Sequence, residues 1–152
     1  MNYFHVHLKV KDLAKSIAFY NALFNQEATL QKGDYAKWQL EEPRVNFAIS
    51  TAAEGAEGIE HLGLQAESSA DLQQLYAQME KAEGDIREEG KTICCYAQSE
   101  KSWIEDPQGV SWEVFHTQGE ATVYGTGEHA KKAPTSMESW ADNEKSAAPF
   151  CC

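Results

Sequence analysis

Apolar and polar side chains alternate over residues 3–10. Val6, Leu8 and Val10 occupy every second position, and His5 and His7 fall between them. Successive side chains of a β-strand point to opposite faces, so this period of two predicts a strand. The two histidines would then share the face opposite the apolar stripe.

The spacing of apolar residues changes after residue 12. Asp12 stands where a helix N-cap is expected. The apolar positions that follow recur at helical spacing, and they are Leu13, Ile17, Tyr20 and Phe24. Residues 27–31 and 35–40 flank a turn at 32–34 and predict a hairpin, and residues 45–50 predict a further strand. The first half is therefore expected to fold as β-α-β-β-β.

The same order of elements returns after the glycine- and alanine-rich residues 52–58. Residues 59–67 predict a strand, and Ser68 with Asp71 forms a capping-box-like start to a second helix. The apolar stripe of that helix is Leu72, Leu75, Tyr76 and Met79. A loop is expected near residues 98–101. The remaining strand segments are predicted at residues 85–89, 91–98, 102–105 and 110–116.

The two halves also match in sequence. His5-Val-His-Leu returns as His61-Leu-Gly-Leu, an offset of 56 residues (61 − 5), and Pro43-Arg-Val-Asn-Phe-Ala-Ile corresponds to Gln108-Gly-Val-Ser-Trp-Glu-Val. A repeat of this length indicates a duplicated unit. The pattern predicts one α+β domain over residues 1–117, built from paired βαβββ modules at about 1–54 and 57–117. Residues 118–152 lack sustained periodicity and predict an irregular tail.

Composition narrows the class of protein. The chain has 152 residues, 42% of them hydrophobic, and a formal net charge of −11. That charge argues against nucleic acid or an anionic membrane as a partner. No run approaches the ~18 apolar residues of a membrane span, and the N-terminus lacks the pattern of a signal peptide. Four cysteines in an untargeted chain favour the cytoplasm.

The four cysteines form two neighbouring pairs, Cys94-Cys95 and Cys151-Cys152. A disulfide between adjacent residues closes a strained ring. Two adjacent soft thiolates, in contrast, suit a thiophilic ion or metalloid. We expect the first pair to be a binding site. The second pair is either a collector or relay for the same ligand or an incidental feature of the tail.

Three potential metal ligands lie on strand faces opposite apolar stripes, and they are His5, His61 and Glu113. Two histidines and one carboxylate form the facial triad suited to ferrous iron and oxygen chemistry, and zinc or manganese fits the same ligands. The wide spacing is not a local motif, so a solvated glutamate and two unrelated histidines are the alternative. His7 shares the face of His5 and is the competing ligand.

Two segments resemble a known superfamily. Residues 5–20, from His5-Val-His-Leu to Ala-Phe-Tyr20, and residues 106–115, Asp-Pro-Gln-Gly-Val-Ser-Trp-Glu-Val-Phe, resemble the opening and closing motifs of the vicinal oxygen chelate, or glyoxalase/dioxygenase, superfamily. The resemblance implies the paired βαβββ fold and a divalent metal. The central Thr92-Ile-Cys-Cys-Tyr-Ala with Lys101-Ser-Trp103 is similar to the ArsI-type C–As lyases and the related cadmium-induced proteins.

That family implies a ferrous, oxygen-dependent enzyme that removes carbon from trivalent organoarsenicals and releases arsenite. By position, the resemblance implies Fe(II), or another divalent metal, on His5, His61 and Glu113. It also implies arsenic held for catalysis by Cys94 and Cys95. Further candidates for the arsenical site are Tyr96, Lys101, Cys151 and Cys152. Family members can carry glutamine where this chain has His5, which leaves room for a different metal preference.

Two other functions remain open at the level of sequence. One is a non-enzymatic protein that binds arsenic or cadmium through its thiols, which would leave the histidines and Glu113 unused. The other is a different metalloenzyme of the superfamily, which would leave the paired thiols unused. Methylated and aromatic arsenicals are both candidate substrates. A homodimer is a candidate oligomeric state.

Overall fold

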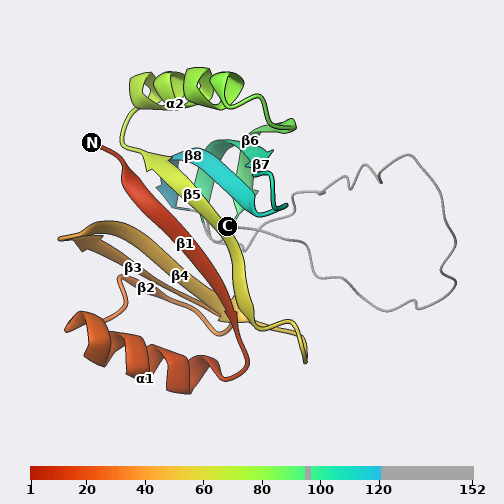
Figure 1. Cartoon of the computed structure of the whole chain (residues 1–152). Helices are drawn as coiled ribbons and strands as arrows, with labels where there is room; N and C mark the ends of the chain where they lie inside the picture. Colours follow the sequence, from red (N-terminus) through yellow and green to blue (C-terminus); the bar gives the residue numbers. More distant parts are fainter. Residues whose placement is uncertain (95–96, 121–152) are drawn as a thin grey trace, which may run out of the picture.

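The computed structural model describes residues 1–94 and 97–120, which form one mixed sheet of eight strands and two helices (Figure 1). The elements in chain order are β1 (Tyr3–Val10), α1 (Leu13–Phe24), β2 (Leu30–Gln31), β3 (Tyr35–Glu41), β4 (Arg44–Thr51), β5 (Gly58–Ala66), α2 (Ser69–Lys81), β6 (Ile86–Cys94), β7 (Ala97–Glu105) and β8 (Ser111–Glu120). The predicted α+β class and the doubled βαβββ order are confirmed.

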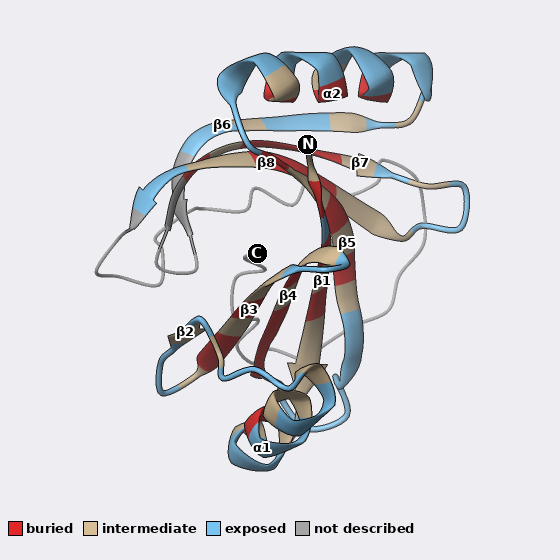
Figure 2. Cartoon of the chain, turned by 90° about the vertical axis from the view of Figure 1, so that its left-hand side faces the viewer, coloured by how far each residue is buried: buried red, intermediate tan, exposed pale blue. Residues whose placement is uncertain are grey.

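The two modules lie side by side in one sheet, with the strand order β2-β3-β4-β1-β5-β8-β7-β6. The first strands of the two modules, β1 and β5, pair antiparallel at the centre. Each of them also pairs parallel with the last strand of its own module, β4 and β8 respectively. The sheet curls, and both helices lie on its outer side (Figure 2). The inner, concave face of the central strands is therefore left for other side chains.

The outer face of the first module is covered by α1. Asp12 caps this helix as predicted, because its Oδ1 accepts a hydrogen bond from the Lys15 backbone N–H at 3.0 Å. Ile17 packs with Trp38 and Ile49 in one buried cluster. Burying side chains of this size contributes about 1.5–3 kcal/mol each, so the cluster fixes the helix on the sheet.

The outer face of the second module is covered by α2 in the same way. The Ser68 hydroxyl accepts a hydrogen bond from the Asp71 backbone N–H at 3.1 Å and donates one to the Asp71 carboxylate at 2.8 Å. The predicted helix start is thus confirmed. The helix buries its stripe in a second cluster, made of Ala66, Leu72, Leu75, Met79 and Val114. Each module therefore has its own outer core, and the inner face carries no part of either.

The predicted loop near residues 98–101 is wrong. These residues lie within β7, which pairs with β6 from Ile86↔Ile104 to Cys94↔Ala97. The predicted strands 85–89 and 91–98 are joined over residues 86–94 into one strand, β6, which continues past Gly90 with a shift in register, and residues 97–98 belong to β7. Gly90 adopts a φ of 67°, a conformation that suits glycine at a bulge. Strand β6 therefore ends at Cys94, and β7 begins at Ala97 and runs antiparallel to it.

Several predicted features lie outside the described residues. Cys95 and Tyr96 fall between β6 and β7, and Cys151 and Cys152 fall beyond Glu120. The last strand, β8, runs on to Glu120, longer than the predicted segment 110–116. Neither α1 nor α2, the helices of the described part, is long and apolar enough to cross a membrane.

Candidate metal centre

One row of residues crosses the three central strands. His5 on β1 pairs with Gly63 on β5, and Gly63 pairs with Glu113 on β8. His61 precedes Gly63 by two residues on β5, so its side chain belongs to the same face as that row. The curled sheet thereby brings together three side chains that lie far apart in the sequence.

Gly63 leaves the middle of the row open. A Cβ atom at this position would clash with the Glu113 backbone oxygen and lie 3.3 Å from the Glu113 Cβ. Glycine in a strand interior is typical of such a close approach. Because the row has no side chain at its centre, His5 and Glu113 can reach toward each other across β5.

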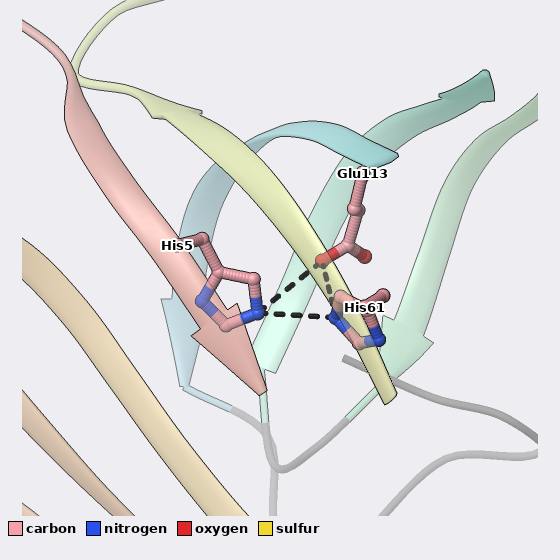
Figure 3. Close-up of side chains that lie close together, drawn as sticks. All are labelled: His5, His61 and Glu113. Atoms are coloured by element: carbon pink, nitrogen blue, oxygen red, sulfur yellow. Dashed lines mark hydrogen bonds and ion pairs between the residues drawn. The ribbon is translucent and has the colours of Figure 1, made fainter. Parts of the chain in front are cut away.

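The three side chains converge on one point (Figure 3). The Nε2 atoms of His5 and His61 are 3.1 Å apart. Glu113 Oε2 lies 3.5 Å from His61 Nε2 and 3.8 Å from His5 Nε2. All three side chains are at most 2% exposed. The group is thus compact and almost completely shielded from solvent.

His5 presents a free lone pair to this point. Its Nδ1–H donates to the Asn46 backbone oxygen at 3.0 Å, because a carbonyl can only accept, and this leaves Nε2 unprotonated. Burial and the neighbouring His61 ring lower the pKa of His5 to about 3, so the ring is neutral near pH 7. A neutral imidazole held by its other nitrogen is the usual state of a histidine metal ligand.

Glu113 is held as a carboxylate by a buried lysine. Lys101 Nζ lies 2.6 Å from Glu113 Oε1, and the Lys101 side chain is only 1% exposed. Burial alone would raise the pKa of Glu113, but the Lys101 ammonium and the nearby His61 hold that pKa well below its usual range. One carboxylate oxygen is thus neutralised by Lys101, and the other faces the two histidines.

Aromatic rings form the walls around the group. The ring centroid of Phe115 lies 5.2 Å from that of His5, and the Trp103 centroid lies 5.0 Å from that of His61. His7 packs against His61 from the other direction at 5.0 Å. These contacts restrict rotation of both imidazoles and limit the approach of water.

The three ligand atoms fit a divalent metal. Bonds of 2.0–2.2 Å place the ligand atoms of a tetrahedral or octahedral ion about 3.0–3.5 Å apart, close to the 3.1–3.8 Å found between these atoms. Glu113 Oε2 is buried and has no hydrogen-bond partner among the described residues. A carboxylate oxygen of this kind is costly unless a cation satisfies it. His5, His61 and Glu113 therefore could hold one ion.

Of the other predicted site residues, Cys94 and Lys101 lie within the described part of the chain. Cys94 ends β6, level with Ala97, which pairs with Glu120 at the end of β8. Seven residues separate Glu120 from Glu113 along that strand, about 23 Å if it were straight. Lys101 lies on β7 beside Glu113. Tyr96, Cys95, Cys151 and Cys152 lie outside the described residues.

Two contacts escaped the sequence analysis. Lys101 was assigned to a loop, although Ser99, Lys101 and Trp103 alternate in the strand and are all buried. That alternation was the available signal. The competing ligand His7 lies outside the group of three, and it contacts Glu60, a residue to which no role was assigned from the sequence.

Comparisons with known proteins agree with this arrangement. The family model described as the Glyoxalase/Bleomycin resistance protein/Dioxygenase superfamily matches residues 2–114. The chain is 40% identical over 124 residues to a probable trivalent organoarsenical cleaving enzyme of Bacillus subtilis (strain 168), covering 81% of this chain and 85% of that protein. It is 41% identical over 121 residues to a trivalent organoarsenical cleaving enzyme of Bacillus sp. (strain MD1), covering 77% and 74%.

Solved structures support the fold. The Mn(II)-bound glyoxalase from Novosphingobium aromaticivorans superposes with a TM-score of 0.56 at 22% identity, over 77% of this chain and 39% of that chain. At this identity the likeness concerns the fold alone. The family model and the relatives thus confirm the resemblance drawn from the opening and closing motifs, and the solved structure confirms the fold.

Proposed function

Because the chain belongs to the Glyoxalase/Bleomycin resistance protein/Dioxygenase superfamily, we propose that it cleaves the carbon–arsenic bond of trivalent organoarsenicals and releases arsenite. The observation that carries the proposal is the buried group of His5, His61 and Glu113 in a chain that also has vicinal thiols. Its relatives at 40% and 41% identity are named as organoarsenical cleaving enzymes. Methylated and aromatic arsenicals both fall within the proposal.

The proposed metal is Fe2+, held by His5, His61 and Glu113. Two imidazoles and one carboxylate leave open coordination positions, as oxygen-dependent ferrous sites require. When bound, the ion would supply the capacity to react with molecular oxygen. Zn2+ or Mn2+ would fit the same donors, so the choice of Fe2+ rests on the proposed oxygen chemistry.

The residues around the ligands keep the site ready to bind a cation. The Asn46 backbone oxygen fixes the His5 tautomer, and Lys101 keeps Glu113 ionised and occupies its Oε1. With Oε1 engaged, Glu113 is limited to a single-oxygen contact through Oε2. Phe115 and Trp103 exclude water from the two histidine rings.

The proposed substrate clamp is Cys94 with Cys95. Trivalent arsenic is soft, and two adjacent thiolates can bind it while its carbon substituent projects away. Holding the arsenical by two bonds would remove much of the entropic cost of the reaction, several kcal/mol on general grounds. Since Cys94 ends β6, catalysis requires this end of the hairpin to approach the inner face over Glu113.

The test is an oxygen-controlled assay of arsenic species. Fe2+-loaded protein is mixed with a trivalent methylarsenical without air, then air is admitted and the arsenic species are separated. We expect arsenite only when both iron and oxygen are present. Tight binding of the arsenical without conversion would contradict the enzyme and favour a thiol-based sequestering protein.

A further inference from the structure

A second group of buried polar atoms lies beside the first, on the far side of His61. It consists of His7, Glu60 and His61, whose ligand-type atoms all lie within 4.8 Å of one another. His7 is fully buried, and the side chains of Glu60 and His61 are each 2% exposed. The proposed function uses neither Glu60 nor His7.

A β-bulge brings Glu60 to this place. His7 pairs with His61, but the next residue of β1, Leu8, pairs with Ile59, so β5 has one extra residue, Glu60. Regular alternation would send Glu60 and His61 to opposite faces of the sheet. A bulge re-aims a side chain, and here it turns a carboxylate toward a buried pair of histidines.

Three polar atoms of this group lack regular hydrogen bonds within the described part of the chain, namely both Glu60 carboxylate oxygens and His7 Nδ1. Glu60 Oε2 lies 2.9 Å from His7 Nδ1, 3.6 Å from Lys9 Nζ and 3.9 Å from His61 Nδ1. The 2.9 Å contact between Glu60 and His7 is an ion pair only when the His7 ring is protonated. A buried carboxylate costs free energy unless a cation is near, and in this structure the partly exposed Lys9 ammonium at 3.6 Å has that role.

His7 is oriented as a metal ligand would be. Its Nε2 lies 2.9 Å from the Ser50 hydroxyl, itself only 2% exposed. A cation bound here would take the Nδ1 lone pair, and the ring proton would then lie on Nε2, which would donate to Ser50 Oγ. The first group has the same arrangement, in which the Asn46 backbone oxygen accepts a hydrogen bond from the ring nitrogen of His5 that does not face the group, Nδ1.

We propose that His7, Glu60 and His61 form a second site for a borderline divalent cation such as Zn2+. Its ligand-atom distances of 2.9 and 3.9 Å lie on either side of the roughly 3.4 Å expected for tetrahedral zinc. Lys9, which is 19% exposed, can withdraw to solvent when a cation enters. The nitrogen and oxygen donors suit zinc better than a hard or a very soft ion.

His61 belongs to both groups and would connect the two cations. Its Nε2 faces His5 and Glu113, and its Nδ1 faces Glu60. A neutral imidazole has only one lone pair, so binding both cations releases the remaining ring proton to solvent. This inference shares His61 with the proposed function but depends on neither arsenic nor oxygen.

The test counts zinc in a full-length variant with all four cysteines changed to serine, so that thiols do not bind the metal. We expect about two Zn2+ per chain, in line with two sites of three protein ligands each. Glu60→Gln should lower the number to about one, and so, independently, should Glu113→Gln. The matched control is Glu57→Gln, an exposed acidic residue near the start of the same strand.

Two results would overturn the proposal. One is a single Zn2+ per chain before any change at Glu60. The other is a second Zn2+ that persists in Glu60→Gln, which would mark adventitious binding at surface carboxylates. Cadmium NMR of the same cysteine-free chain covers the case in which Glu60→Gln does not fold. Two resonances from sites with nitrogen and oxygen donors are expected, and a single resonance contradicts the proposal. Failure here leaves the arsenite assay untouched, and failure of that assay leaves the zinc count untouched.

Discussion

The two modules share a fold but differ in one pair of residues on the inner face. In the second module Gly63 pairs with Glu113. The repeat places His7 and Ala48 at the corresponding positions of the first module, and these two residues pair with each other. The second module thus combines an empty position with an acid, and the first combines an imidazole with a methyl group.

This difference explains why the two modules do not give two equivalent copies of the candidate metal centre. A symmetric pair would offer a histidine and a glutamate from each half. Ala48 cannot ligate a cation, and His7 fills the space that Gly63 leaves open in the other half. The first module therefore contributes His5 alone to the candidate metal centre, and its second histidine joins Glu60 instead. The duplicated module forms the scaffold, and the residues that differ in the row of Gly63 and Glu113 determine where the candidate metal centre lies.

The largest effect is expected from Lys101, the buried lysine of the second module that pairs with Glu113. Lys101→Met leaves Glu113 buried without its partner, which should lower the free energy of unfolding by about 3 kcal/mol at pH 7. Glu113 has a lowered pKa in the folded protein, so its contribution is present above its ordinary value of 4.5 and is lost as the pH falls through the lowered value. The difference between variant and parent should therefore shrink in acid, as urea unfolding at several pH values will measure.

The control for this prediction is Lys91→Met, an exposed lysine on the neighbouring strand β6. It should change the free energy of unfolding by less than about 0.5 kcal/mol. A Lys101→Met variant as stable as the control at pH 7 would mean that Lys101 does not hold Glu113 ionised.

A second change replaces the acidic residue of the second module by the residue at the corresponding position of the first module. Glu113→Ala introduces the residue found at position 48 and should weaken Fe2+ binding by about 100-fold or more, since outer partners of metal ligands alone contribute 10- to 100-fold. Binding of the trivalent arsenical should be retained, because the proposed clamp is elsewhere. Anaerobic titrations of both ligands measure this. Unchanged iron affinity would remove Glu113 from the site.

A third change fills the empty position. Gly63→Ala places a Cβ against the Glu113 backbone, and overpacking of this kind costs about 1–3 kcal/mol. Iron affinity should fall as well, because Glu113 must shift. Gly33→Ala is the matched control, since a Cβ there meets nothing within 4 Å. Equal stability of the two variants in urea would show that the strands do not approach as closely as described.

The smallest effects are expected where the modules are alike. Asp12→Ala and Ser68→Ala each remove the hydrogen bond that caps a helix, and each should cost about 1 kcal/mol of unfolding free energy. Neither should alter iron affinity, because both helices lie on the outer side of the sheet (Figure 2). A large difference between the two variants, measured by urea unfolding, would break the symmetry proposed for the outer cores.

Local pattern was enough to predict most of the fold. Alternation defined β1, and Asp12 and Ser68 marked the helix starts because capping depends on neighbouring residues alone. The end of β6 at Cys94 and the start of β7 at Ala97 were missed because no glycine or proline marks them. Without that signal, the continuous strand β7 was divided by a loop at residues 98–101.

The candidate site was predictable only in part, because it depends on contacts between distant strands. The ligand residue types and the doubled motif suggested His5, His61 and Glu113, but their meeting follows from the pairing of β1, β5 and β8. The contact of Lys101 with Glu113 was missed because residues 98–101 were predicted as a loop, and the strand alternation that places Lys101 on the inner face was therefore not applied to it. The position of the Glu60 side chain could not be predicted from alternation, because a bulge reverses the face of the sheet on which a side chain lies.

The central claim is that an arsenical held by Cys94 and Cys95 comes next to a metal held by His5, His61 and Glu113. The direct measurement is the ligand-field spectrum of the Fe2+-loaded protein, recorded without air before and after one equivalent of a trivalent methylarsenical. The account predicts a shift of the iron bands in the parent protein and none in Cys94→Ser, with iron content equal in both. Stoichiometric binding of the arsenical with unchanged iron bands would contradict it.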